Sequence, residues 1–223
     1  MPNILLLLKR QNIMPTSYSR FKIEDLFDLN IKIERNIVFN GNIDPIEPSE
    51  LLKATIKKNL SKNLASEKAK SEFLISPIVA EIAENNVDTM SFYSGYQFDV
   101  DKTHGLRGFC DFIFSLEPRA LIIMAPFFCV VEAKNENLDL GIPQCIAEMY
   151  AAWLFNQRKG RDISTIYGVV TYGYAWQFLR FSNMKAELDE TVYSLSELPK
   201  ILGILQHIID LQKRPLSTEA LSQ

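Results

Sequence analysis

Apolar and polar positions alternate along the chain with spacings that predict several strands. The run Phe127–Val131 has no polar position, which is typical of a strand buried on both faces. Other apolar segments are bounded by Gly, Pro, Asn and Asp and have strand-like lengths. The predicted strands are Ser91–Val100, Leu106–Leu116, Pro126–Ala133, Thr165–Tyr172 and Ala175–Ser182, followed by a short pair at Lys185–Leu188 and Thr191–Leu195.

Helical periodicity appears in four other segments, where apolar residues recur every three or four positions. In the second of these helices Ser66 is a good N-cap, and Pro77 predicts a kink or a restart. The predicted helices are Ser49 to about Asn63, Glu67–Asn85, Gly141–Asn156 and Ser196–Gln212. Strands and helices in this order indicate an α/β domain with a central mixed sheet flanked by helices.

The first part of the chain has a different pattern. Two strands are predicted at Arg20–Phe27 and Lys32–Phe39, with a turn between them, before a loop rich in Asn, Gly and Pro. We therefore expect residues 1–47 to form an N-terminal β/α extension and residues 48–223 to form the α/β domain, with its core at about 66–182.

Composition excludes some classes of function. The chain has 223 residues, of which 47% are hydrophobic and 23% charged, with a net charge of −3. This balance argues against a broadly basic nucleic-acid coat but leaves room for a local basic groove. The apolar run Ile4–Leu8 is too short to span a membrane and is followed by basic residues, so neither a signal peptide nor a membrane partner is expected. The three cysteines have apolar neighbours and no C-x-x-C spacing, which indicates reduced thiols and a cytoplasmic location.

Candidate chemistry lies at the end of the buried strand. Glu132 and Lys134 are spaced i, i+2, so a strand puts both side chains on one face. Asp111 is a single carboxylate within the preceding apolar strand. Two carboxylates from adjacent strands suit Mg²⁺, with Mn²⁺ as an alternative, because hard cations prefer oxygen ligands. The competing interpretation is structural: Glu132 and Lys134 form an ion pair with each other or with neighbouring residues.

These motifs resemble the PD-(D/E)xK nuclease superfamily. The resemblance is carried by Gly108-x-x-Asp111, then Val131-Glu132-Ala133-Lys134, then Gln144 on the next helix, and it extends to a bacterial, often cyanobacterial, group within the superfamily. It implies a restriction-endonuclease-like core, with Asp111 and Glu132 as metal ligands and Lys134 as the catalytic lysine.

The resemblance leaves two further positions open. The superfamily often adds an acidic residue on the first core helix, where Glu67 is the first choice, Glu72 the second, and Glu81 also competes. Some branches carry a Tyr four residues after the Gln, but this chain has Glu148 there, which argues against the RecB-like branch. Gln144 either contacts the site or is a polar residue in an exposed first turn.

The function expected from these features is a Mg²⁺-dependent nuclease, with DNA as the expected nucleic-acid partner and a homodimer as one option. The alternative is a catalytically silent protein of the same fold that acts as a nucleic-acid-binding or assembly subunit. The choice between DNA and RNA, and between endo and exo action, stays open. Aromatic residues around Gly173, among them Tyr172 and Tyr174, are most simply structural, and stacking on bases is the minor alternative.

Overall fold

A seven-stranded mixed sheet occupies the centre of the computed structural model, which describes residues 15–39 and 43–213. The strand order is β1-β7-β6-β5-β4-β3-β2. The pairs β1–β7 and β4–β5 are parallel, and the other neighbours are antiparallel. The strands are β1 Lys32–Asn36, β2 Ser91–Gln97, β3 Phe109–Ser115, β4 Phe127–Ala133, β5 Thr165–Thr171, β6 Ala175–Ser182 and β7 Lys185–Ser194.

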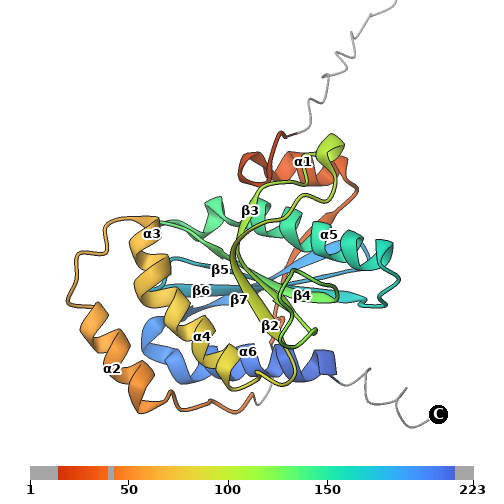
Figure 1. Cartoon of the computed structure of the whole chain (residues 1–223). Coiled ribbons are helices and arrows are strands. Elements are labelled where there is room, and N and C mark those ends of the chain that lie inside the picture. The colour runs from red at the N-terminus through yellow and green to blue at the C-terminus, as the bar shows by residue number, and fades with distance from the viewer. Residues whose placement is uncertain (1–14, 40–42, 214–223) are drawn as a thin grey trace, which may run out of the picture.

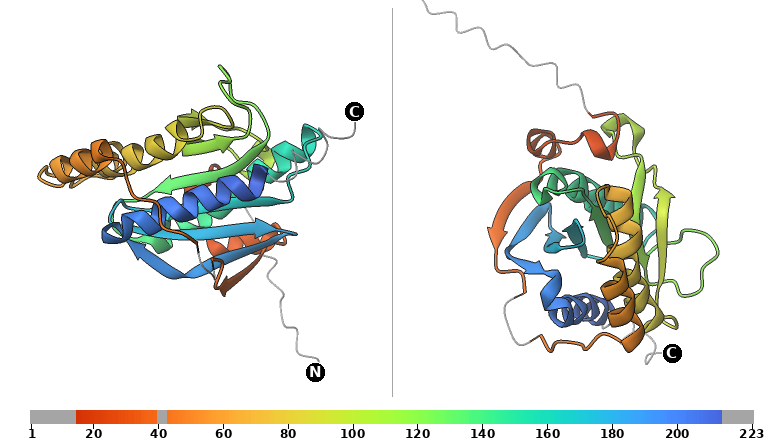
Figure 2. Two further views of the ribbon diagram at one scale, coloured as in Figure 1. Left: turned by 90° about the horizontal axis from the view of Figure 1, so that it is seen from below. Right: turned by 90° about the vertical axis from the view of Figure 1, so that its left-hand side faces the viewer.

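Helices cover both faces of this sheet, as the sequence pattern predicts. Helix α5 lies on one face and contacts β4 and β5, whereas α6 lies on the opposite face and contacts α4 (Figures 1 and 2). The α-helices are α1 Ile23–Asp28, α2 Glu50–Asn59, α3 Glu67–Lys70, α4 Ser76–Glu84, α5 Ile142–Arg158 and α6 Leu198–Lys213. The prediction of an α/β domain with a helix-flanked mixed sheet is confirmed.

The predicted helix around Pro77 is present and contains the expected irregularity. Its segments α3 and α4 are joined by a π-helical turn, Ser71–Ile75, directly before Pro77. Proline lacks an N–H and crowds the preceding turn, so a locally wider turn accommodates it within one continuous helix. Ser66 is the N-cap, as predicted, and its side chain accepts a hydrogen bond from the N–H of Ala69 at 3.1 Å.

The structure corrects two predictions about strands, one at residues 20–27 and one for the pair at the end of the sheet. Residues 20–27 do not form a strand, because Ile23–Asp28 is helix α1, whose Leu26 packs into the core. The predicted pair at the end of the sheet is one continuous strand, β7, which pairs with β6 on one side and β1 on the other. Strand β6 pairs with both halves of β7 across a register shift, and β1 pairs with Lys185–Asp189, so the chain stays extended where a turn was expected.

Strand β4 is the buried centre of the fold. All seven of its residues are buried, as expected for a strand with neighbours on both edges and helices over the sheet. Within the described residues, no helix has both the length and the apolar composition needed to cross a bilayer. The apolar run Ile4–Leu8 lies outside the described residues.

Candidate functional site

Strands β3 and β4 bring two carboxylates to neighbouring positions. Phe112 pairs with Val131 across these antiparallel strands, so Asp111 and Glu132 occupy the next position along the ladder. The N–H of Ala133 donates to Oδ2 of Asp111 at 2.7 Å, so the aspartate side chain bridges the two strands where their regular pairing ends. One oxygen of Asp111 is therefore used to fix its orientation.

Glu132 and Lys134 form an ion pair at the end of β4. Their side chains are 2% and 16% exposed, so this contact is shielded from water. The Lys134 ammonium also donates to Oε1 of Gln144 at 3.1 Å. The structural interpretation, in which Glu132 and Lys134 form an ion pair with each other, is thus correct for this contact. Whether the pair also takes part in chemistry depends on the residues around it.

The pKa of Lys134 is raised, although its side chain is largely buried. Burial by itself lowers this pKa, but attraction and hydrogen bonding to Glu132, with the charges of Glu67 and Asp111, outweigh burial and raise it. Lys134 therefore remains a cation at neutral pH.

Gln144 is part of this network and is not exposed. Only 8% of its surface is accessible, although it lies in the first turn of α5. Its side-chain oxygen accepts from Lys134, and its nitrogen donates to Oε1 of Glu148 at 3.0 Å. Gln144 thus connects the lysine at the end of β4 to a carboxyl group one helical turn further along α5.

Glu148 is a buried site residue that the sequence reasoning did not select. It is fully buried on α5, and its pKa is raised to about 8, first by burial and also by the charge of Asp111. The pKa of Glu132 is likewise raised well above its usual value, by burial, by Glu148 and by Asp111. The signal was in the sequence, because Glu148 follows Gln144 by four residues on the apolar face of a helix.

Two carboxylate oxygens in this cluster have no partner. Oε2 of Glu132 and Oε2 of Glu148 are buried without a hydrogen bond from any described residue. A buried carboxylate oxygen is costly unless it meets a proton, a donor or a cation. The raised pKa values of Glu132 and Glu148 mean that, without a cation, protons satisfy these oxygens, including through a hydrogen bond between the two carboxyl groups; a bound cation would supply the same positive charge.

The acidic candidates on the preceding helix have different surroundings. Both oxygens of Glu81 accept hydrogen bonds at 2.6 Å from the N–H and hydroxyl of Ser49, so Glu81 supports the N-terminus of α2 instead of the site. Glu72 forms an ion pair with Lys68 at 2.8 Å on the surface of the helix.

Glu67 is the helix carboxylate that acts electrostatically on the cluster. Burial raises the pKa of Asp111, and the charge of Glu67 adds to this rise. Glu67 and Asp111 also line the same open cavity of about 300 Å³, between this helix and the edge of the sheet. The other lining residues are Lys68, Ser71, Glu72, Ser76, Ser94, Gly95 and Phe112.

A glycine keeps this cavity open beside Asp111. Gly95 lies between Ser94 and Tyr96, which pair with the two neighbours of Asp111 on β3, so Gly95 is opposite Asp111. Its φ of +60° is left-handed, and a Cβ built there would meet nothing within 4 Å. Glycine inside a strand is typical where another molecule approaches the backbone closely.

The donor set fits a hard divalent cation. Asp111 and Glu132 offer carboxylate oxygens, and the orphaned Oε2 of Glu132 lacks the partner that a cation would supply. Among the residues that the structure describes, no group of three or more His, Cys, Asp or Glu side chains is arranged to hold a metal. Mg²⁺ is commonly held by one or two carboxylates with waters completing its shell, so two carboxylates suffice.

Compared with protein-family models, the chain matches none, and no curated protein sequence matches it either. The resemblance to PD-(D/E)xK nucleases thus stays an expectation drawn from the motif residues.

Proposed function

We propose that this protein is a divalent-metal-dependent phosphodiesterase that cleaves nucleic acid, with DNA as the expected substrate and a restriction-endonuclease-like core. The observation that carries the proposal is the buried cluster of Asp111, Glu132 and Lys134 at the ends of β3 and β4, with one unpartnered carboxylate oxygen. Asp111 of this cluster also lines an open cavity, and a cluster of this composition is suited to charge-stabilised chemistry on a phosphate.

Asp111 and Glu132 would hold Mg²⁺ or Mn²⁺ in this proposal. A bound divalent cation lowers the pKa of a coordinated water and neutralises charge on a phosphate. Neither effect is available without the cation. Cleavage is therefore expected to depend strictly on added metal.

Lys134 would act through its ammonium group, which lies beside Glu132 at the end of β4 and would donate hydrogen bonds to an attacking water or to a phosphate oxygen. Gln144 would hold the ammonium in place through its 3.1 Å contact. Glu67, which lines the same cavity as Asp111 and acts electrostatically on it, would be the third carboxylate of the site.

The proposal is tested by incubating the purified protein with plasmid, duplex, single-stranded DNA and RNA in Mg²⁺, Mn²⁺ or a chelator. We expect cleavage of at least one substrate with metal and none with the chelator. The melting temperature should also rise on addition of metal, because a ligand that binds only the native state stabilises it. Absence of cleavage for every substrate, with an unchanged melting temperature, would contradict the proposal.

Gln144→Ala should lower the cleavage rate by about 10-fold, because residues that orient a catalytic group typically contribute this much. The change removes the link between Lys134 and Glu148 and leaves both of these side chains in place. Steady-state cleavage kinetics measure the effect, with Gln157→Ala on the exposed end of α5 as the matched control. An equal rate for both variants would show that Gln144 does not position the lysine.

One observation favours the second candidate, a catalytically silent nuclease-fold protein. The Lys134 ammonium already contacts Glu132 and Gln144, which competes with contacts to a substrate. A silent protein would bind nucleic acid without cleaving it in any metal, and replacement of Lys134 by Gln would leave this binding unchanged.

A further inference from the structure

The β5–β6 turn is a tightly built structure that presents two tyrosines, Tyr172 and Tyr174. Between them, Gly173 has a φ of +85°, which favours glycine. The Cα of Gly173 packs against the side chain of Leu74 in the π-helical turn, and a Cβ at this position would lie 2.9 Å from Leu74. The hydroxyl of Thr171 accepts from the N–H of Gly173 at 2.9 Å and donates to the carbonyl of Ala175 at 2.8 Å.

Contacts from the core hold the same turn on its inner side. The indole N–H of Trp176 donates to the carbonyl of Gly173 at 3.1 Å, and the N–H of Leu195 donates to the carbonyl of Tyr174 at 2.8 Å. Trp176 itself is fully buried. A turn with its backbone groups satisfied in this way holds its side chains in defined directions at little entropic cost on binding.

The two tyrosine rings lie partly in solvent. Tyr174 is 38% exposed, Tyr172 is half-buried, and their ring centroids are 6.4 Å apart with the planes tilted by 45°. Tyrosine is enriched at binding surfaces because it combines an apolar ring with a polar hydroxyl.

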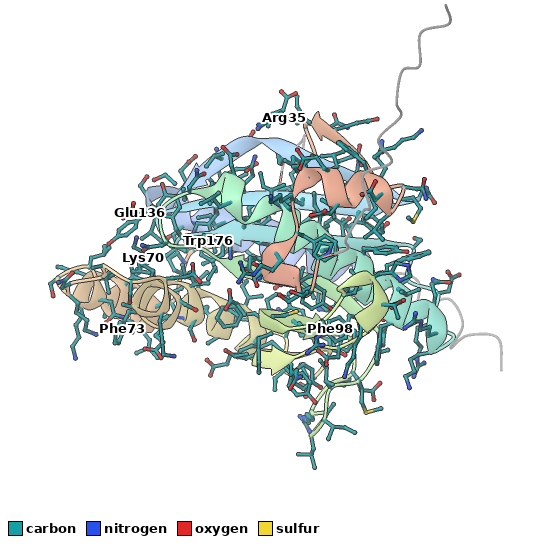
Figure 3. The ribbon with its side chains drawn as sticks, turned by 90° about the horizontal axis from the view of Figure 1, so that it is seen from above. Arg35, Lys70, Phe73, Phe98, Glu136 and Trp176 are labelled. Atoms are coloured by element: carbon teal, nitrogen blue, oxygen red, sulfur yellow. The ribbon has the colours of Figure 1, made fainter. Side chains whose placement is uncertain are left out.

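A buried lysine joins these rings to the candidate site. The Lys70 ammonium lies 5.9 Å from the centroid of Tyr172 and donates to the backbone and side-chain oxygens of Asn135, the latter at 3.1 Å. Asn135 directly follows Lys134, whose N–H donates to the carbonyl of Thr171 at 2.7 Å. Figure 3 places Lys70, Glu136 and Trp176 at this same end of the molecule.

We propose that Tyr172 and Tyr174 form a stacking platform for unpaired bases next to the scissile phosphate, so that the preferred substrate is single-stranded or locally unpaired nucleic acid. This inference rests on the proposed function and names its substrate class. Every base has an aromatic face, so the platform accepts different sequences. The parallel pairing of β4 and β5 places the tyrosine turn and Lys134 at the same end of the sheet.

The platform is tested by fluorescence anisotropy with a short labelled oligothymidylate and a blunt duplex of the same length, in a chelator so that no cleavage occurs. We expect the full-length protein to bind the single strand more tightly than the duplex. Tyr174→Ala should weaken single-strand binding by about 5- to 100-fold, the range for loss of one base–aromatic stack. Tyr174→Phe keeps the ring and should bind like the wild type.

Phe27→Ala is the matched control, because Phe27 is an exposed aromatic residue on α1. Its affinity should equal that of the wild type, and the melting temperatures of all variants should agree. Unchanged affinity in Tyr174→Ala, an equal loss in Tyr174→Phe, or equal wild-type affinity for single strand and duplex would each overturn the platform.

Metal-dependent cleavage separates this test from the test of the proposed function. A Tyr174→Ala protein that binds and cleaves like the wild type, while Asp111→Asn does not cleave, overturns the platform and leaves the nuclease proposal standing. Stacking that depends on Tyr174 in a protein that never cleaves supports the platform and overturns the nuclease proposal.

Discussion

Replacing Asp111 by Asn should lower the rate of nucleic-acid cleavage by at least about 1000-fold, the upper range for loss of one essential group in a charge-stabilised reaction. Asparagine keeps the size of the side chain and an oxygen that can still accept from the N–H of Ala133. The local fold is therefore expected to persist, and the loss comes from removal of the negative charge that would bind the metal. Single-turnover cleavage with Mg²⁺ or Mn²⁺ measures it.

The control for this variant is Asp162→Asn, an exposed aspartate that should cleave at the wild-type rate. The metal-dependent rise in melting temperature should also disappear in Asp111→Asn and persist in the control. If Asp111→Asn cleaves within a few-fold of the wild type, Asp111 is not a metal ligand, and the cluster has another purpose.

The second large effect is on stability and lies at the other end of the sheet. Glu187 on β7 is 3% exposed, and its carboxylate pairs with Arg180 at 2.8 Å and with Lys185 at 3.1 Å. Asn36 of β1 donates to it at 2.9 Å. Glu187→Gln should lower the free energy of unfolding at neutral pH by about 2 kcal/mol, because it leaves Arg180 without its charged partner; the partial exposure of Arg180 limits the loss.

The pH dependence of this loss follows from the pKa of Glu187. Burial alone would raise this pKa, but bonds from Asn36, Arg180 and Lys185 outweigh burial and lower it from 4.5 to about 2. A carboxylate whose pKa is lower in the folded state than in the unfolded state stabilises the folded state at pH values above the unfolded-state pKa. This stabilisation is lost as the pH falls toward the folded-state pKa. The difference between wild type and Glu187→Gln should therefore be full at neutral pH and shrink between pH 4.5 and about 2.

Urea unfolding followed by tryptophan fluorescence at neutral and acidic pH measures this change. Glu190→Gln, an exposed glutamate on the same strand, should have little effect at either pH. A constant difference between wild type and Glu187→Gln across this range would mean that the ion pair does not set the pKa.

Much of the fold could be predicted from local pattern alone. Strand β4 is predictable because it is a nearly continuous apolar run, and β5 and β6 are predictable because they are short, largely apolar segments bounded by turn residues. The same pattern could not tell helix from strand at residues 20–27, where a few apolar positions suit either element. Helix α1 forms because Leu26 packs into the core there, and this is a tertiary effect.

The candidate site also contains features that the sequence predicts and features that only the tertiary structure shows. The i, i+2 spacing of Glu132 and Lys134 was sufficient to place both side chains together, because strand geometry alternates faces. The choice among three helical glutamates could not be made locally, because each lies near the start or kink of one helix. Only the tertiary structure shows that Glu81 accepts hydrogen bonds from Ser49, whereas Glu67 lines the cavity beside Asp111.

The sequence by itself determined the α/β class, the buried central strand, the charged pair Glu132 and Lys134 at its end and the single carboxylate Asp111 in the preceding strand, because hydrophobic periodicity and strand alternation are local properties of a chain. Tertiary structure decided what surrounds those charges: a buried Glu148, a Gln144 that joins it to Lys134, and two unpartnered carboxylate oxygens. It also decided that the pKa of Lys134 rises, because the balance between burial and neighbouring carboxylates depends on distances that no sequence pattern encodes.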